Sequence, residues 1–239
     1  MLNFLTKILG QQTIDFYKVF IEDKYYMVVF KGMLWTLGLT AIALVIGTLI
    51  GIVVAVIQMS QFSKELKWLE KILKTITKVY IDIIRGTPAA VQIVLMWTVL
   101  FAGLPLPRIL VGGIAFGINS GAYMAELIRA GIQGIDKGQT EAGRSLGFKY
   151  TETMRYIIMP QAFKQMLPAF VSEFIVLIKE TAIISFIGGT DLMKASSIMM
   201  SRTYNALQPL LIVAACYLLL TGIFTKIMRK VEKKINISN

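Results

Sequence analysis

The sequence has no histidine, a single cysteine and no Gly-Lys dipeptide among its 239 residues. Without histidine, the chain lacks the most common metal ligand and the most common general base of proteins. The one thiol, Cys216, can form neither an internal disulfide nor a cysteine cluster for a metal. A Walker A phosphate loop requires Gly-Lys, so the chain is not expected to hydrolyse ATP by itself. We therefore expect no catalytic residue, no metal site and no cofactor in this chain.

Charged residues are also scarce, at 16% of the chain, whereas hydrophobic residues make up 56%. A soluble domain contains about 25% charged residues, so the composition predicts an integral membrane protein. The net charge of +11 is compatible with nucleic-acid binding, but the basic residues are spread along loops beside apolar runs. The positive-inside rule explains this distribution better, so no nucleic-acid partner is expected.

The apolar runs predict an all-α fold with about five transmembrane helices. The five predicted spans lie within 32–63, 86–107, 109–132, about 167–188, and 203–225. Between them, residues 64–85 have the rhythm of an amphipathic helix that leads into the second span, and residues 189–205 form a polar connection. Residues 1–26 mix apolar and charged positions and are predicted to be an interfacial N-terminal segment.

The positions of lysine and arginine predict the orientation of the chain. The segments 64–85, 129–164 and 226–234 hold 17 of the 25 basic residues, so they should lie in the cytoplasm, with the N-terminus outside. Residues 27–229 then form the transmembrane domain with a cytoplasmic loop at 133–165. Residues 230–239 form a basic cytoplasmic tail that contacts anionic lipid headgroups. No long-period repeat is visible, so an inverted-repeat secondary transporter is not supported.

The longest water-compatible segment among the apolar runs is EAGRSLGFKYTETMRYIIMP at 141–160. We predict a short helix that Thr140 caps and Gly147 ends. A second helix should run from about Lys149 to Pro160, where the missing backbone donor breaks or bends the chain. From composition alone, an ordinary cytoplasmic loop is the simpler interpretation.

A second motif, RGTP at 85–88 followed by VQ at 91–92, predicts a bend. Pro88 disfavours a helical conformation at Thr87, and glycine permits unusual dihedral angles. The alternative is that this motif is only the N-terminal boundary of the second span.

The third predicted span has a polar face. Asn119, Tyr123 and Glu126 lie at i, i+4 and i+7, and Ser120 is adjacent. Polar groups within a span usually face the protein interior or a water-filled path. The alternative is that Asn119 and Ser120 hold helices together beside neighbouring glycines, and that Glu126 pairs with Arg129.

The fourth predicted span contains Glu173, Lys179, Glu180 and Thr181. Charged residues within a span are functional hypotheses by default, although Lys179 can also extend outward to the interface. We interpret Lys179 and Glu180 as part of the helix framework, and Glu173 or Thr181 as residues that line a path.

The spacing within 141–160 resembles the EAA loop of ABC importer permeases, in which EAA is followed by three residues, G, nine residues and I-x-L-P. Gly143 replaces the third residue of that pattern, and Met159 replaces the leucine. The 85–92 motif is similar to F-R-G-T-P-x-x-V-Q of permeases for polar amino acids, with isoleucine in place of phenylalanine. Residues 173–182 look like the E-F…L-K-D-T-S run of the same permeases, with Glu180 for Asp and Ala182 for Ser.

This resemblance covers about residues 27–229 and implies the transmembrane subunit of a bacterial type I ABC importer in the cell (inner) membrane. It implies two ATPase subunits that bind ATP and Mg²⁺, a second permease chain, identical or similar, and an external solute-binding protein. The residues expected to couple to the ATPase are Glu141, Ala142, Gly143, Arg144, Ser145, Leu146 and Gly147. The expected substrate-binding residues are Thr87, Gln92, Asn119, Ser120, Tyr123, Glu126, Glu173 and Thr181.

Three acidic residues in or near the spans favour a basic amino acid as the substrate, such as arginine, lysine or histidine. A channel or secondary-carrier subunit outside the ABC class, or a regulatory membrane anchor, would also explain the apolar spans. Neither alternative explains the spaced loop at 141–160.

Overall fold

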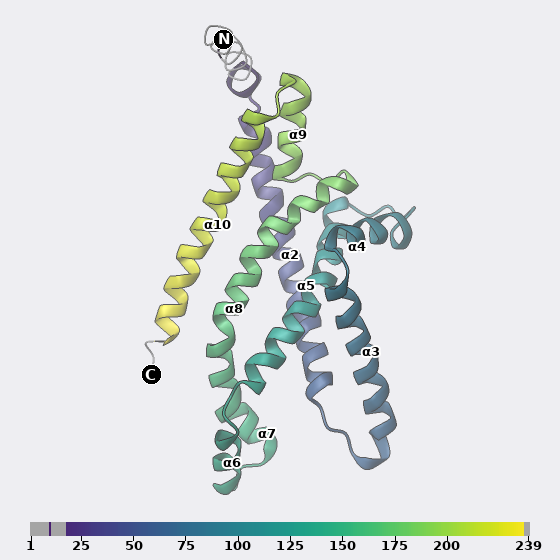
Figure 1. Cartoon of the computed structure of the whole chain (residues 1–239), viewed down its shortest axis with the longest axis vertical. Helices are drawn as coiled ribbons and strands as arrows, with labels where there is room; N and C mark the ends of the chain where they lie inside the picture. The colour runs from purple at the N-terminus through teal and green to yellow at the C-terminus, as the bar shows by residue number, and fades with distance from the viewer. Residues whose placement is uncertain (1–9, 11–17, 237–239) are drawn as a thin grey trace.

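The structure is a computed structural model that describes residue 10 and residues 18–236. Throughout that part of the chain the regular elements are helices, as the all-α prediction requires. In order they are η1 (Lys18–Glu22), α2 (Tyr26–Met59), η2 (Lys64–Leu66), α3 (Lys67–Gly86), α4 (Ala89–Leu95), η3 (Met96–Leu100), α5 (Arg108–Gln133), α6 (Lys137–Ser145), α7 (Tyr150–Thr153), η4 (Met154–Ile158), α8 (Met159–Glu180), η5 (Thr181–Ile187), α9 (Leu192–Thr203) and α10 (Leu207–Asn236). The molecule is elongated, with α6 and α7 at one end and α9 at the other (Figure 1).

Two of the described helices, α2 and α10, are each long and apolar enough to cross a membrane alone. Helix α5 agrees closely with the third predicted span at 109–132. The total of five spans and the direction of insertion stay predictions. The interfacial segment predicted at 1–26 falls mostly outside the described residues, and the described part of the predicted tail continues helix α10.

The prediction that the second span is a single helix over 86–107 was wrong. The chain bends by 111° between α3 and the segment formed by α4 and η3. Thr87 is extended, with φ −126° and ψ 150°, because Pro88 restricts the residue before it and has no backbone donor. At 1.5 Å per residue, the segment 89–100 is only ~18 Å long, whereas α3 reaches ~30 Å. By length and composition, α3 and the segment after the bend qualify as a span only when they are taken together.

Helix α8 begins and ends earlier than the predicted fourth span. Pro160 does not end the second helix as predicted, since the chain stays helical through Pro160 from η4 into α8. The π-helical turn η4 joins α7 to α8 without a gap. The polar connection at 189–205 also contains a helix, α9. The Asp191 carboxylate caps α9 by accepting from the backbone N–H groups of Met193 and Lys194.

Helices α2 and α5 run parallel and form the centre of the fold. Isoleucines of α2 lie opposite glycines of α5 that are spaced four residues apart. The opposed pairs are Ile42–Gly113, Ile46–Gly117 and Ile50–Gly121. A Cβ atom added to the middle glycine would lie 2.5 Å from Ile46 Cγ2. Small residues at this spacing allow helix backbones to approach closely within a membrane, so the two helices form one tightly packed unit.

Candidate functional site

The short helix of the water-compatible loop is α6, and its N-cap is Asp136. Asp136 Oδ1 accepts a hydrogen bond from the backbone N–H of Gly138 at 2.7 Å. The predicted cap, Thr140, instead lies inside the helix, so that prediction was wrong. Aspartate is as good an N-cap as threonine or better, and its carboxylate is also favoured by the positive helix N-terminus.

The end of α6 agrees with the prediction. Gly147 has φ +89°, in the left-handed region that favours glycine. Its N–H donates to Arg144 O at 3.0 Å, and the N–H of Phe148 donates to Gly143 O at 3.2 Å. These two bonds form a Schellman motif, which satisfies carbonyl groups at the helix end and turns the chain sharply.

Gly143 lies at the contact between α6 and the segment formed by α7 and η4. It is buried, and a Cβ atom added there would lie 2.8 Å from both Ile157 Cδ1 and Thr153 Cγ2. Gln161 Nε2, in the first turns of α8, also donates to Gln139 Oε1 of α6 at 3.2 Å. The backbone of α6 therefore packs directly on the start of the long helix α8. The other predicted coupling residues form an exposed surface, namely Glu141, Ala142, Arg144, Ser145, Leu146 and Gly147.

At the α3–α4 bend, the side chain of Gln92 makes four hydrogen bonds. Its amide nitrogen donates to Ile84 O at 2.8 Å, to Thr87 O at 3.1 Å and to Thr87 Oγ1 at 2.6 Å. Its amide oxygen accepts from Asn119 Nδ2 of α5 at 2.8 Å. Gln92 and Asn119 are buried, so in this conformation they hold the bend against α5 and do not face an open path.

Two turns further along α5, Glu126 belongs to an ionic cluster. Its carboxylate accepts from Arg129 Nε at 2.9 Å and from Arg129 Nη2 at 2.8 Å. Arg85, at the end of α3, approaches the same carboxylate at 3.5 Å and lies 5.5 Å from the centre of the Tyr123 ring. Tyr123 is 37% exposed. The cluster therefore has one carboxylate between two guanidinium groups, beside an accessible aromatic ring.

The remaining predicted residues are Ser120 of α5, Glu173 of α8 and Thr181, the first residue of η5. Ser120 Oγ donates to Glu173 Oε1 at 3.3 Å, so these two residues connect the two helices. Thr181 is fully buried, and its hydroxyl donates to Ile178 O at 2.7 Å, so it does not face a path in this conformation. Within the described part of the chain, no group of three or more His, Cys, Asp or Glu residues could hold a metal.

The comparison with known protein families decides the assignment. The family model described as "Binding-protein-dependent transport system inner membrane component" matches residues 47–237. The chain belongs to this family. The permease is therefore a membrane transport subunit of the ABC class, and the channel and secondary-carrier alternatives are not supported.

Relatives match nearly the whole permease. It is 37% identical over 210 residues to the putative glutamine transport system permease protein GlnP of Rickettsia bellii, covering 87% of this chain and 93% of that one. It is 36% identical over 209 residues to the arginine transport system permease protein ArtQ of Bacillus subtilis, covering 87% and 92%.

Two solved structures also match the fold of the permease. The crystal structure of an amino acid ABC transporter with histidines has a TM-score of 0.80 and 42% identity, covering 89% of this chain and 96% of that one. An inward-facing MetNI methionine ABC transporter structure has a TM-score of 0.70 at 18% identity, covering 87% and 96%. At that identity, the second match shows only a shared fold.

Three residues at these sites were not among the predicted site residues. Asp136 follows the ordinary preference of helix N-caps, so the sequence held a signal for it. Arg85 is part of the RGTP motif, but only the fold brings it to Glu126 from another helix. Thr153 had no signal, because its position beneath Gly143 depends on how α6 folds back on η4.

Proposed function

We propose that this permease forms the membrane path of an ATP-driven importer of polar amino acids. The relatives named for glutamine and for arginine transport support this substrate class. In the proposed assembly, two permease chains, identical or similar, combine with two ATPase subunits and an external solute-binding protein. ATP and Mg²⁺ bind to the ATPase subunits, and the permease itself catalyses no reaction.

The observation that carries the proposal is the packing of α6 on the helix that continues into α8. The exposed surface of α6 is the part that docks in a groove of the ATPase, a helix-in-groove contact. When ATP closes the ATPase dimer, the docked helix moves as a rigid body. Because Gly143 brings the α6 backbone against η4, that movement passes to α8 and through Glu173 to α5.

The preference for a basic substrate stays a prediction. It requires an acidic side chain that is free to face the cationic substrate, and Glu173 is now the main candidate. Glu126 is already paired with Arg129 and Arg85, so its carboxylate is not a free counter-charge. Arg85, which approaches Glu126 only to 3.5 Å and is partly exposed, is instead suited to the α-carboxylate that every amino acid carries. Uptake of arginine and of glutamine by the same reconstituted complex, each in competition with the other, would measure the preference.

A substitution at Gly147 tests the coupling role. Gly147→Val should insert into the membrane but separate ATP hydrolysis from uptake, because a β-branched residue at φ +89° strains the Schellman turn. Gly147→Asn is the matched control, since asparagine tolerates the left-handed region. The measurement is ATP hydrolysed and amino acid taken up by the same vesicles. Normal coupling in the valine variant, or failure of an ATPase to copurify with the wild type, would contradict the proposal.

A further inference from the structure

Helix α3 presents three different faces. Its basic residues recur at intervals of three, four and seven residues and therefore share one face. This face, called the basic stripe, consists of Lys67, Lys71, Lys74, Lys78 and Arg85. A second face is apolar and exposed, and consists of Trp68, Ile72, Ile76, Val79 and Ile83. The third face contains Thr77, Ile81 and Ile84 and is buried against α2 and α5.

The basic stripe and the exposed apolar face run side by side at the same depth. Lys71 is adjacent to Ile72 and Lys78 is adjacent to Val79, so members of the two faces differ by one residue along the helix axis. The exposed apolar face is suited to lipid. Charged side chains at hydrocarbon depth face a protein interior or a water-filled cavity. The stripe therefore marks the wet side of α3.

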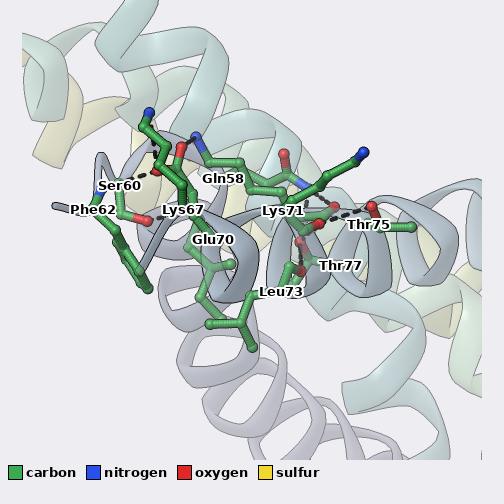
Figure 2. Close-up of polar contacts among 11 residues, drawn as sticks. Gln58, Ser60, Phe62, Lys67, Glu70, Lys71, Leu73, Thr75 and Thr77 are labelled. Carbon is green, nitrogen blue, oxygen red and sulfur yellow. Dashed lines mark hydrogen bonds and ion pairs between the residues drawn. The ribbon is translucent and has the colours of Figure 1, made fainter. Parts of the chain in front are cut away.

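The surface of the structure is hollowed along this stripe. A cavity of about 780 Å³ is lined by the four lysines, with Glu70 and Asp82 as the acidic residues of its lining. Glu70 is already engaged, since it accepts from Lys74 Nζ at 2.9 Å and from the backbone N–H of Phe62 at 3.0 Å (Figure 2). Among the described residues, Lys71 and Lys78 have no ion-pair partner. The cavity therefore has a net positive charge.

The stripe leads to the ionic cluster on α5. Arg85 lies two helical turns beyond Lys78 on the same face, and it is the residue that contacts Glu126 and the Tyr123 ring. At its other end, the stripe reaches the loop that joins α2 to α3, at the end of the molecule away from α9 (Figure 1). The basic residues of the stripe, with Glu70 and Asp82 among them, therefore extend from the ionic cluster to the side predicted to be cytoplasmic.

We propose that the basic stripe of α3 lines the water-filled route by which the amino acid leaves the candidate site for the cytoplasm, with the lysines attracting its α-carboxylate. The inference rests on the proposed function and adds the side chains and the charge of the exit route. Lysine ammonium groups bind carboxylates through charge-assisted hydrogen bonds, and every amino acid carries an α-carboxylate whatever its net charge. An anionic lipid headgroup could bind the same lysines, so the experiment must distinguish a lipid headgroup from the α-carboxylate of an amino acid.

The test uses single-cysteine variants of the full complex with its ATPase in inside-out vesicles, in a Cys216→Ser background. Lys71→Cys and Lys78→Cys probe the stripe, and Ile72→Cys and Ile76→Cys are controls at similar depth on the exposed apolar face, outside the lining of the cavity. The probes are two membrane-impermeant methanethiosulfonates, one with an anionic sulfonate and one with a cationic trimethylammonium group. Only the stripe variants should react. The sulfonate should react on the order of 10-fold faster than the cationic reagent, after correction for their intrinsic rates.

Adding Lys74→Gln to the stripe variants should reduce this preference for the anionic reagent. Equal reaction on the two faces, or the absence of a charge preference, would overturn the inference. Suppression of the reaction by phosphatidylglycerol, relative to vesicles of neutral phosphatidylcholine, would show that headgroups occupy the stripe and would also overturn it. ATP-driven release of lumenal amino acid by the Cys216→Ser parent, in the same inside-out vesicles loaded with amino acid and solute-binding protein, tests the proposed function separately. ATP-driven release with an unreactive stripe overturns only the inference, whereas no ATP-driven release overturns the proposed function and with it the inference.

Discussion

The substitution Gly143→Ala adds one methyl group where α6 packs on α7 and η4. The new Cβ atom would lie 2.8 Å from Ile157 Cδ1 and from Thr153 Cγ2. Ile157 Cδ1 is the end of a flexible side chain and can move aside, but Thr153 is buried and its methyl group is fixed close to the backbone. Because carbon atoms pack best at about 3.5–4.0 Å, α6 must move outward by ~1 Å. Overpacking of this kind destabilises by about 1–3 kcal/mol.

The expected result is a loss of coupling rather than a loss of the complex. A displaced α6 transmits less of the ATPase movement to α8, so uptake per ATP hydrolysed should fall while basal ATP hydrolysis remains. The assay reconstitutes the complex in vesicles and measures both quantities in the same sample, together with the thermal unfolding midpoint.

Thr153→Ala supplies the compensating change, because it removes the methyl group that the new Cβ meets. Thr153 Oγ1 has no hydrogen-bond partner among the described residues, so its removal leaves no group unsatisfied. A double-mutant cycle should give a favourable interaction of about 0.5–3 kcal/mol. Gly222→Ala is the matched control, since a Cβ atom there meets nothing within 4 Å. The reasoning is refuted if Gly143→Ala behaves like that control, or if Thr153→Ala restores nothing.

Two further substitutions test the polar contacts. Gln92→Leu leaves Asn119 Nδ2 without its acceptor and should lower the free energy of unfolding by about 1–3 kcal/mol; an unchanged thermal midpoint of the purified complex would argue against a structural role. Asp191→Ala removes the N-cap of α9 and the acceptor of the Tyr217 hydroxyl, which should cost about 0.5–2 kcal/mol. Burial raises the pKa of the Asp191 carboxyl. Asp191→Asn should lose less than Asp191→Ala, because the asparagine side-chain oxygen can still accept at the N-cap, and an equal loss in both variants would contradict this account.

The sequence was sufficient to predict the elements whose signals are local. Long apolar runs predicted α2, α5 and α10, and Gly147 predicted the end of α6. The predictions failed where two local signals competed. Pro160 can end a helix or be accommodated within one beside a π-helical turn, as it is between η4 and α8, and the local sequence does not decide between them. Similarly, both Asp136 and Thr140 can cap α6.

The candidate site was only partly predictable, because periodicity places residues on a face but does not say what covers that face. Asn119 and Glu126 share one side of α5, as predicted. However, the Asn119 amide donates a hydrogen bond to Gln92, and Arg85 contacts Glu126 from another helix. Such contacts between distant segments depend on the bend at Pro88. The RGTP motif predicted that bend, but not its angle of 111°.

The isoleucine–glycine pairs of α2 and α5 restrict which movements can occur during a transport cycle. Sliding one helix along the other would push Ile46 out of the space above Gly117 and against the larger residues between the glycines. The next equivalent register is four residues away, a translation of ~6 Å. Small axial shifts between these helices are therefore blocked, and a change between inward-open and outward-open states has to rotate α2 and α5 together, with adjustment left to the less deeply buried helix α10.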